Sequence, residues 1–149
     1  MESDGIRSRY LEALKAKLGE KSADLVYPPP VYTAMKGEML DFDLGAGILT
    51  NRFPVLREYL NPYGSLQGGI IATLLDDTIG PLSLLVAPAN VTRTLEVKFR
   101  RPVTPDLGAV TVTARFTGQN ERQLFFEAEM KSGDGTIRAQ ARAVHWILA

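Results

Sequence analysis

The sequence lacks cysteine and has a single histidine, His145, among its 149 residues. Without cysteine it has no disulfide framework, no thiolate nucleophile and no zinc site built on thiolates. A Ser-His-Asp triad, a His-rich metal centre or a His-Glu dehydratase pair would have to use this one imidazole, which lies in the last five residues of the sequence. We therefore expect carboxylates, amides and backbone groups to carry the chemistry, without a metal or a cofactor.

An excess of either charge is also missing, since 17 Lys and Arg balance 17 Asp and Glu. Nonspecific nucleic-acid binding depends on neutralising phosphates, so we expect no nucleic-acid partner. The N-terminal residues carry charges where a signal peptide would need an apolar stretch. Asp76 and Asp77 interrupt the longest apolar run, 70–86, which favours a buried core helix over a membrane span. These features predict one cytoplasmic domain with no membrane partner.

The spacing of apolar residues predicts the order of the elements. An amphipathic helix is expected over 3–18, followed by a proline-rich connector at 27–30. A period of two predicts a hairpin from about 39 to 53, with its turn at Gly45-Ala46-Gly47. Residues 68–86 are apolar on nearly every face, as in a helix enclosed by other structure. Four alternating segments follow, at 91–101, 108–118, 122–131 and 136–148.

This order predicts the fold class α+β, with an antiparallel sheet wrapped around one long central helix and an extra N-terminal helix. We expect residues 1–34 to form the N-terminal helix and connector, and residues 35–149 to form the sheet-and-helix domain. Such a sheet has exposed edges, which proteins commonly pair with a second copy. The fold therefore predicts a homodimer or a larger assembly.

Two glycines, Gly68 and Gly69, stand where the long helix begins. Glycine lets a ligand approach the first backbone N–H groups, which lack intrahelical partners and lie at the positive end of the helix dipole. At 100° per residue, one face of the helix gathers the small and polar residues Gly69, Ala72, Thr73, Asp76, Gly80 and Ser83. We expect a groove there and an oxyanion site at the glycines.

Asp76 lies in the middle of this groove, where a carboxylate needs a partner or a cleft. It is therefore a candidate functional residue, while Asp77, rotated by 100°, should face elsewhere. The alternative is that either carboxylate caps a neighbouring backbone group or points to solvent. Pro81 cannot donate to the carbonyl of Asp77 and predicts a bend one turn beyond Asp76.

The stretch from Asn61 to Asp76 resembles the signature of the hot-dog fold acyl-CoA thioesterases of the phenylacetate-pathway (PaaI-like) type. In that family Asn, a turn with Gly and His-Gly-Gly precede an aliphatic stretch that ends in a catalytic Asp or Glu. Here the pattern reads Asn61, Gly64, Gln67-Gly68-Gly69 and Asp76. Residues 92–103 are similar to the strand and Arg-Pro corner that follow the helix, and the resemblance covers roughly 35–148. The sequence departs at Gln67, because glutamine replaces the usual histidine and does not titrate near neutral pH.

The resemblance implies hydrolysis of a small or medium acyl-CoA by a homodimer or a homotetramer built as a dimer of dimers. The Gly68 N–H would stabilise the oxyanion, and Asp76 of the other subunit would act as base or nucleophile. Asn61 would orient the loop or the water, and Gln67 would contact the thioester. Substrate binding would involve Gly69, Thr73, Thr92, Arg100 and Arg101. The two arginines belong to a basic group, completed by Arg93 and Lys98, that suits coenzyme A phosphates or else forms a solvated strand face.

Two other functions remain open. A non-catalytic acyl-CoA or lipid-like binder on the same fold is suggested by Gln67. A hot-dog dehydratase or hydratase is disfavoured, because those enzymes use a histidine with an acid and His145 lies far along the chain from Asp76. His145 is expected to be a structural or surface residue. Thiol release, saturable binding without turnover and a change in enoyl absorbance would distinguish the three functions.

Overall fold

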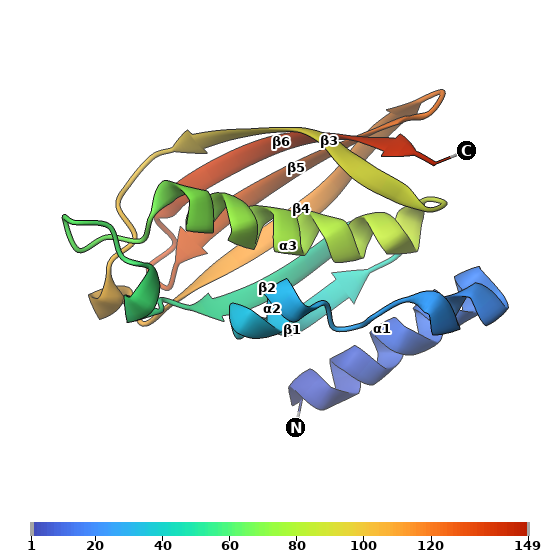
Figure 1. Ribbon diagram of the computed structural model, residues 1–149, viewed down its shortest axis with the longest axis horizontal. Coiled ribbons are helices and arrows are strands. Elements are labelled where there is room, and N and C mark those ends of the chain that lie inside the picture. Colours follow the sequence, from blue (N-terminus) through green and yellow to red (C-terminus); the bar gives the residue numbers. More distant parts are fainter. Residues whose placement is uncertain (1, 149) are drawn as a thin grey trace.

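Within residues 2–148, which the computed structural model describes with side chains from residue 5 onward, six strands form one antiparallel sheet that curves around a long helix (Figure 1). The order across the sheet is β1-β2-β4-β5-β6-β3. The strands are β1 Glu38–Asp43, β2 Ile48–Pro54, β3 Asn90–Phe99, β4 Ala109–Asn120, β5 Gln123–Ser132 and β6 Ile137–Ile147. The α-helices are α1 Glu2–Leu18, α2 Pro30–Ala34 and α3 Gly68–Val86. The predicted α+β hot-dog architecture with an N-terminal helix is confirmed.

The core lies between α3 and the concave face of the sheet. Leu74, Leu75, Ile79 and Leu82 of α3 are at most 1% exposed and belong to one cluster with the inward residues of the strands. By length and composition α3 could cross a membrane, but half of its apolar window is buried inside the protein. The prediction of a core helix over 68–86 is therefore confirmed.

The hairpin of β1 and β2 is also confirmed, and Gly47 shows why its turn needs glycine. Gly47 has a φ of +67°, which residues with a Cβ rarely adopt, and a Cβ there would lie 3.2 Å from Cβ of Phe116. The short helix α2 was not predicted. Pro30 occupies its first turn, where the missing N–H costs no helical hydrogen bond, so the end of the proline run starts a helix.

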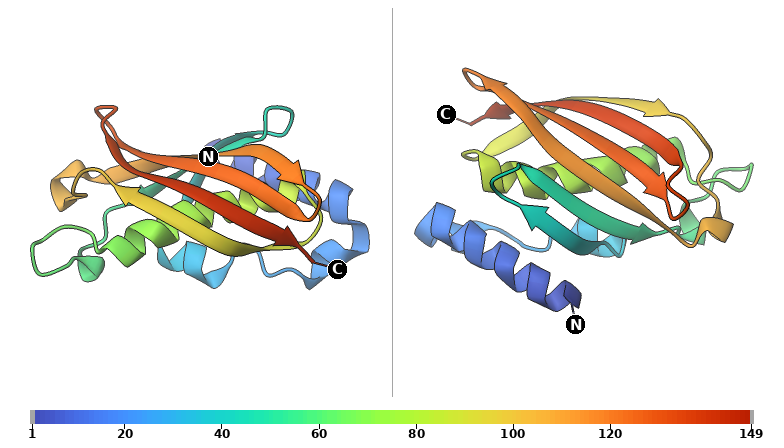
Figure 2. Two further views of the ribbon diagram at one scale, coloured as in Figure 1. Left: turned by 90° about the horizontal axis from the view of Figure 1, so that it is seen from above. Right: turned by 180° about the vertical axis from the view of Figure 1, so that it is seen from behind.

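The predicted N-terminal helix is confirmed as α1, which lies beside β1 and reaches the C-terminal part of α3 (Figure 2). The Tyr10 hydroxyl is buried and donates to the carbonyl oxygen of Pro81 at 2.9 Å. The Lys17 ammonium donates to the carbonyl oxygens of Leu84 and Ala87, at the negative end of α3. These contacts fix α1 against the central helix. The division of the chain at residues 34 and 35 stays a prediction, and its outer ends, Met1 and Ala149, lie outside the described residues.

Candidate active site

A pocket of about 340 Å³ opens beside the middle of α3, with walls that are mostly apolar. The connector before α2 contributes Leu25, Val26 and Tyr27 to it, the open face of α3 contributes Asp76, and β3 contributes Thr92. Its volume is in the range of small-molecule sites, in which apolar walls surround a few polar groups. Of the predicted groove, Asp76, Gly80 and Ser83 line this pocket, and its outer wall comes from the N-terminal segment. The other residues of the predicted face, Gly69, Ala72 and Thr73, do not line it.

Asp76 accepts a hydrogen bond at Oδ1 from the hydroxyl of Thr92, at 3.1 Å. Thr92 lies near the start of β3, the strand that follows α3. Neither ion pair of residues 2–148, Arg52–Glu38 or Lys131–Glu129, involves Asp76. The carboxylate is therefore held by a neutral hydroxyl and faces a pocket, where it can accept a proton or attack a carbonyl carbon.

His145 lies much closer to Asp76 than its place in the sequence suggested. It is 2% exposed, and its Nε2 lies 3.3 Å from Oγ1 of Thr92 while its Nδ1 lies 2.8 Å from Oδ1 of Asn90. Because β6 pairs with β3, His145 is the register partner of Thr92. Burial lowers the pKa of His145, and the charge of Asp76 opposes that shift. The prediction of a structural or surface role missed this chain of contacts, because it rested on separation along the sequence.

Asp77 was expected to face elsewhere, yet it lines the same pocket as Asp76. Its Oδ2 is buried and has no hydrogen-bond partner among the described residues. Burial, together with the neighbouring charge of Asp76, raises the pKa of Asp77 to about 7. The two adjacent carboxyl groups therefore have different surroundings. Among the described residues, Asp76 accepts a hydrogen bond from Thr92, whereas the buried Oδ2 of Asp77 has no partner.

Pro81 leaves the carbonyl of Asp77 without its helical donor, as predicted, and Asn51 supplies a replacement. Asn51 is fully buried on β2, and its Nδ2 donates to the Asp77 carbonyl at 3.3 Å and to the Thr78 hydroxyl at 3.1 Å. Its Oδ1 accepts from the Tyr32 hydroxyl at 3.1 Å. Nothing in the sequence pattern identified this amide, which holds α3 at the height of the two carboxylates.

The glycines Gly68 and Gly69 lie at the N-terminal end of α3. In the described part of the chain, the N–H groups of Gly68 and Gly69 have no backbone acceptor, whereas those of Ile70 and Ile71 both bond to the carbonyl of Gln67. Gln67 is the N-cap residue, is exposed, and makes no side-chain capping bond. The two free donors and the exposed amide therefore lie together at the positive end of the helix.

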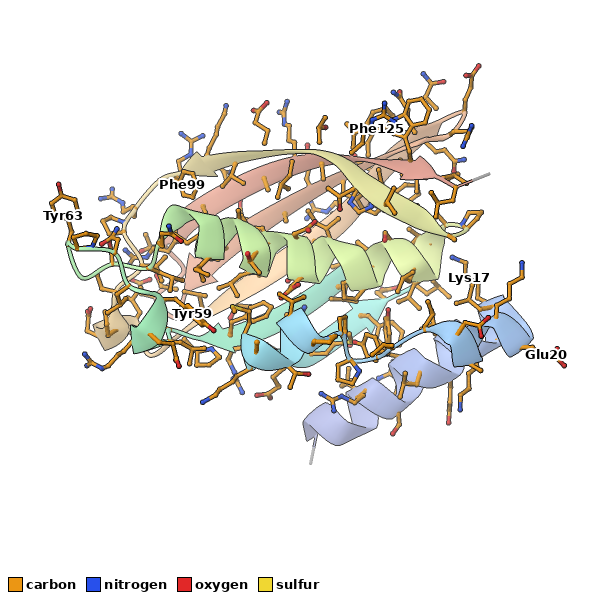
Figure 3. The ribbon with its side chains drawn as sticks, in the orientation of Figure 1. Lys17, Glu20, Tyr59, Tyr63, Phe99 and Phe125 are labelled. Atoms are coloured by element: carbon orange, nitrogen blue, oxygen red, sulfur yellow. The ribbon has the colours of Figure 1, made fainter. Side chains whose placement is uncertain are left out.

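Two aromatic residues lie near the N-terminal end of α3: Phe99 at the end of β3, and Tyr63 in the loop that precedes α3 (Figure 3). A Cβ on Gly68 would lie 3.3 Å from the Phe99 ring. Asn61 orders the loop, because its Oδ1 accepts from the backbone N–H groups of Tyr63 at 2.9 Å and Ser65 at 3.2 Å. Of the roles expected for Asn61, this geometry matches the loop-orienting one.

The glycines and Asp76 do not meet within one chain. Eight residues at 1.5 Å per residue separate Gly68 from Asp76 by about 12 Å along the helix. A thioester group is too small to contact both points at once. Thr73, between them, donates to the carbonyl of Gly69 at 2.9 Å. A site that uses both Gly68 and Asp76 needs a second copy of the chain.

Of the four basic residues expected to form a phosphate patch, Arg93 and Lys98 lie in β3 and Arg100 and Arg101 follow its last residue. The guanidinium of Arg93 lies 4.6 Å from the centre of the Trp146 ring. Lys98 and Arg100 line a hollow on the outer face of the sheet, where Nε of Arg100 donates to Gln140 at 2.9 Å. Arg100 and the exposed Arg101 follow Phe99 and so lie toward the Gly68 end of α3. The structure separates Arg93 from the other three.

Comparisons with known proteins agree on one family. The family model described as "Thioesterase superfamily" matches residues 63–139, just over half of the chain. A Saccharolobus solfataricus protein to which an esterase function is ascribed is 26% identical over 120 residues, covering 79% of this chain and 83% of that protein.

Among solved structures, a phenylacetic acid degradation-related protein of Ralstonia eutropha, ascribed a thioesterase function, has a TM-score of 0.77 and 26% identity and covers 93% of this chain and 99% of that one. The PaaI protein of the Escherichia coli phenylacetic acid degradation operon has a TM-score of 0.77 at 19% identity and covers 91% of this chain and 96% of that one. Each of these two alignments covers more than nine-tenths of this chain.

Proposed function

Because the chain belongs to the thioesterase superfamily, we propose that it hydrolyses the thioester of a small or medium acyl-CoA, with Asp76 as base or nucleophile and the Gly68 N–H as oxyanion donor. Its class is that of a thioester hydrolase. The observation that carries the proposal is the position of Asp76, which lies on the wall of an apolar pocket and is held by Thr92 at 3.1 Å.

The pocket suits an acyl group. Leu25, Val26 and Tyr27 supply an apolar wall opposite the open face of α3. A hydrocarbon or aryl group placed there would be removed from water, at a gain of about 25 cal/mol per Å² of apolar surface. Its thioester carbon would then lie at Asp76. A volume of about 340 Å³ favours small and medium acyl groups over long chains.

The proposal requires a dimer. A two-fold axis beside the edge strand β3 would run the two α3 helices antiparallel, so that the first turn of one, with Gly68, would lie opposite the middle of the other, with Asp76. Val91 and Phe99 of this strand are 49% and 55% exposed, so apolar side chains are available along the edge. Isologous pairing of such an edge would also satisfy its free backbone groups.

The proposed reaction uses water as the second substrate. With Asp76 as base, the carboxylate takes a proton while the water oxygen bonds to the thioester carbon, and the Gly68 N–H stabilises the oxyanion. The C–S bond then breaks, the proton passes to the leaving thiolate, and the free acid and the coenzyme A thiol depart. With Asp76 as nucleophile, an anhydride would form first and water would hydrolyse it.

The other expected residues have supporting roles in this proposal. Gln67, exposed beside Gly69, would donate to the thioester carbonyl, and Asn61 would keep the preceding turn in shape. Thr73 lies on the same helix face. Arg100 and Arg101, at the Gly68 end, would bind phosphate groups of coenzyme A outside the pocket.

A non-catalytic acyl-CoA binder is the second candidate, favoured by the glutamine at position 67. Thiol release from short, medium, long and aryl acyl-CoAs, followed with a thiol reagent, distinguishes the two. The proposal expects turnover that saturates with substrate and is highest for small, medium or aryl acyl groups. Saturable binding of several acyl-CoAs without any thiol release would refute the proposal and establish the binder.

A further inference from the structure

Four polar side chains that line the pocket form a hydrogen-bonded chain: Asp76, Thr92, His145 and Asn90. Asp76 is proposed above to react, and Thr92 contacts it directly. His145 and Asn90 continue the chain of contacts beyond Thr92 and line the same pocket. The roles of these two residues follow from matching the polar hydrogens of the four side chains to the atoms that can accept them.

Asn90 fixes which nitrogen of His145 carries the hydrogen. Nδ2 of Asn90 donates to the carbonyl oxygens of Ser83 at 3.2 Å and Pro88 at 2.8 Å, so the amide can present only its oxygen to the ring. That oxygen lies 2.8 Å from Nδ1 of His145 and must accept from it. In the neutral ring Nε2 then carries no hydrogen, and its lone pair is directed at Oγ1 of Thr92, 3.3 Å away.

The Thr92 hydroxyl has one hydrogen and two acceptors. While Asp76 is ionised, the hydroxyl donates to the carboxylate, since that bond is charge-assisted, and the buried Nε2 of His145 lacks a donor. Once Asp76 carries a proton, its own O–H can donate to Oγ1 of Thr92, and the hydroxyl hydrogen turns to Nε2. Every group in the chain is then satisfied, so the chain is complete only after Asp76 has taken up a proton.

We propose that His145 is a positioning residue, which directs the Thr92 hydroxyl and thereby stabilises the protonated state of Asp76 that forms when this carboxylate takes a proton from water. The inference rests on the proposed function and extends it, because it favours the base role of Asp76 over the nucleophile role. The proton comes from the attacking water, rests on Asp76 while Thr92 reorients, and leaves with the thiolate. No other reactant is needed.

The surroundings of His145 suit this role. Of the residues described, the charged or titratable groups that share its pocket are Asp76 and Asp77 from α3, with Tyr27 and Tyr32 from the N-terminal segment. On β5 its neighbour is the ring of Phe126, with centroids 4.9 Å apart. The ring is thus held by an apolar contact and by the hydrogen bond from Nδ1 to Asn90, with the Thr92 hydroxyl 3.3 Å from Nε2.

The single histidine makes a direct spectroscopic test practicable. In untagged, ¹⁵N-labelled protein at pH 7.5, the imidazole gives one set of signals, and we expect a neutral ring with its hydrogen on Nδ1. In Asp76→Ala the Thr92 hydroxyl loses its carboxylate acceptor and can donate to Nε2, so the Nε2 signal should shift from its wild-type position, and Thr92→Val in that background should abolish the shift while Thr92→Ser keeps it. A ring with its hydrogen on Nε2, or an Nε2 signal that is the same in Asp76→Ala as in the wild type, would overturn the proposal.

Kinetics test the catalytic consequence. His145→Phe keeps a ring beside Phe126 and removes both nitrogens, so kcat should fall by about 10-fold, as for one lost hydrogen bond, with KM within about 2-fold. Starting from Thr92→Val, the same change should cost less than about 2-fold, because His145 acts through Thr92. Thr92→Ser should keep most of the wild-type kcat.

The outcomes separate this proposal from the proposed function. Equal losses of kcat from His145→Phe in the wild-type and Thr92→Val backgrounds would overturn the positioning role. An unchanged kcat in a folded His145→Phe protein would do the same. If the wild-type protein released no thiol from any acyl-CoA, the proposed function would fail, and with it the catalytic consequence, while the position of the ring hydrogen would still decide the hydrogen-bond assignment.

Discussion

Asp77 is expected to make the stability of the fold depend on pH. Its carboxyl group is buried next to Asp76, and its pKa rises from the ordinary value of 3.8 to about 7. Between these two values the unfolded chain has lost the proton while the folded chain keeps it, so the free energy of unfolding falls as the pH rises. The stabilisation is fully present below about pH 4 and is lost by about pH 7.

The size of the effect follows from the shift. Three pKa units at about 1.36 kcal/mol each give an upper limit of about 4 kcal/mol, which the partial exposure of the group reduces. Asp77→Asn removes the titration and keeps the shape of the side chain. We expect this variant to be more stable than the wild type at pH 8 by about 2 to 4 kcal/mol, which is roughly 5 to 15 °C in melting temperature.

Urea unfolding of both proteins at pH 4.5 and pH 8, at one protein concentration, measures this difference. At pH 4.5 the two free energies of unfolding should agree within about 1 kcal/mol, because the side chain at position 77 is neutral in both folded proteins, as a protonated carboxyl group in the wild type and an amide in the variant. Asp106→Asn, an exposed site in the turn before β4, is the matched control and should leave the pH dependence unchanged. If the free energies of unfolding of the wild type and Asp77→Asn differed by the same amount at pH 4.5 and pH 8, the reasoning would be refuted.

Three further predictions concern other parts of the molecule. Sedimentation or light scattering should give a solution mass at least twice the chain mass of 16.4 kDa, and a monomer that still turned over substrate would contradict the shared site. Gln67→Ala should lower turnover by about 10-fold in the thiol-release assay, as for one lost hydrogen bond. Unchanged kinetics would show that Gln67 is only a loop residue. Asn51→Leu leaves the Asp77 carbonyl and the Tyr32 hydroxyl without partners, so the melting temperature should fall by about 5 to 15 °C, whereas the exposed Asn120→Leu should change it by less than about 3 °C.

Much of the fold could be predicted from the sequence, because periodicity reports which faces are buried. The apolar faces of 68–86 and the alternation in the four last strands were enough to place the core helix and the sheet. The short α2 was missed, since a run of prolines indicates an extended chain until its last member starts a helix.

The site was only partly predictable. Asp76 and the glycines could be found because they share one helix and its spacing. His145 could not, because strand pairing brings it to Thr92 from 53 residues away. The wall supplied by Leu25 and Val26 and the position of Asp77 depend on how the N-terminal segment packs on α3, which no local pattern records.

The most direct test of the proposed function is thiol release by Asp76→Asn. The substitution keeps the shape of the side chain and removes the charge needed to accept a proton or attack carbon, so turnover should fall by about 10²-fold or more. Affinity for a non-hydrolysable acyl-CoA analogue should persist, and Asp77→Asn should lose less than about 10-fold in turnover. Near-wild-type thiol release by Asp76→Asn, with or without a loss in Asp77→Asn, would contradict the assignment of Asp76.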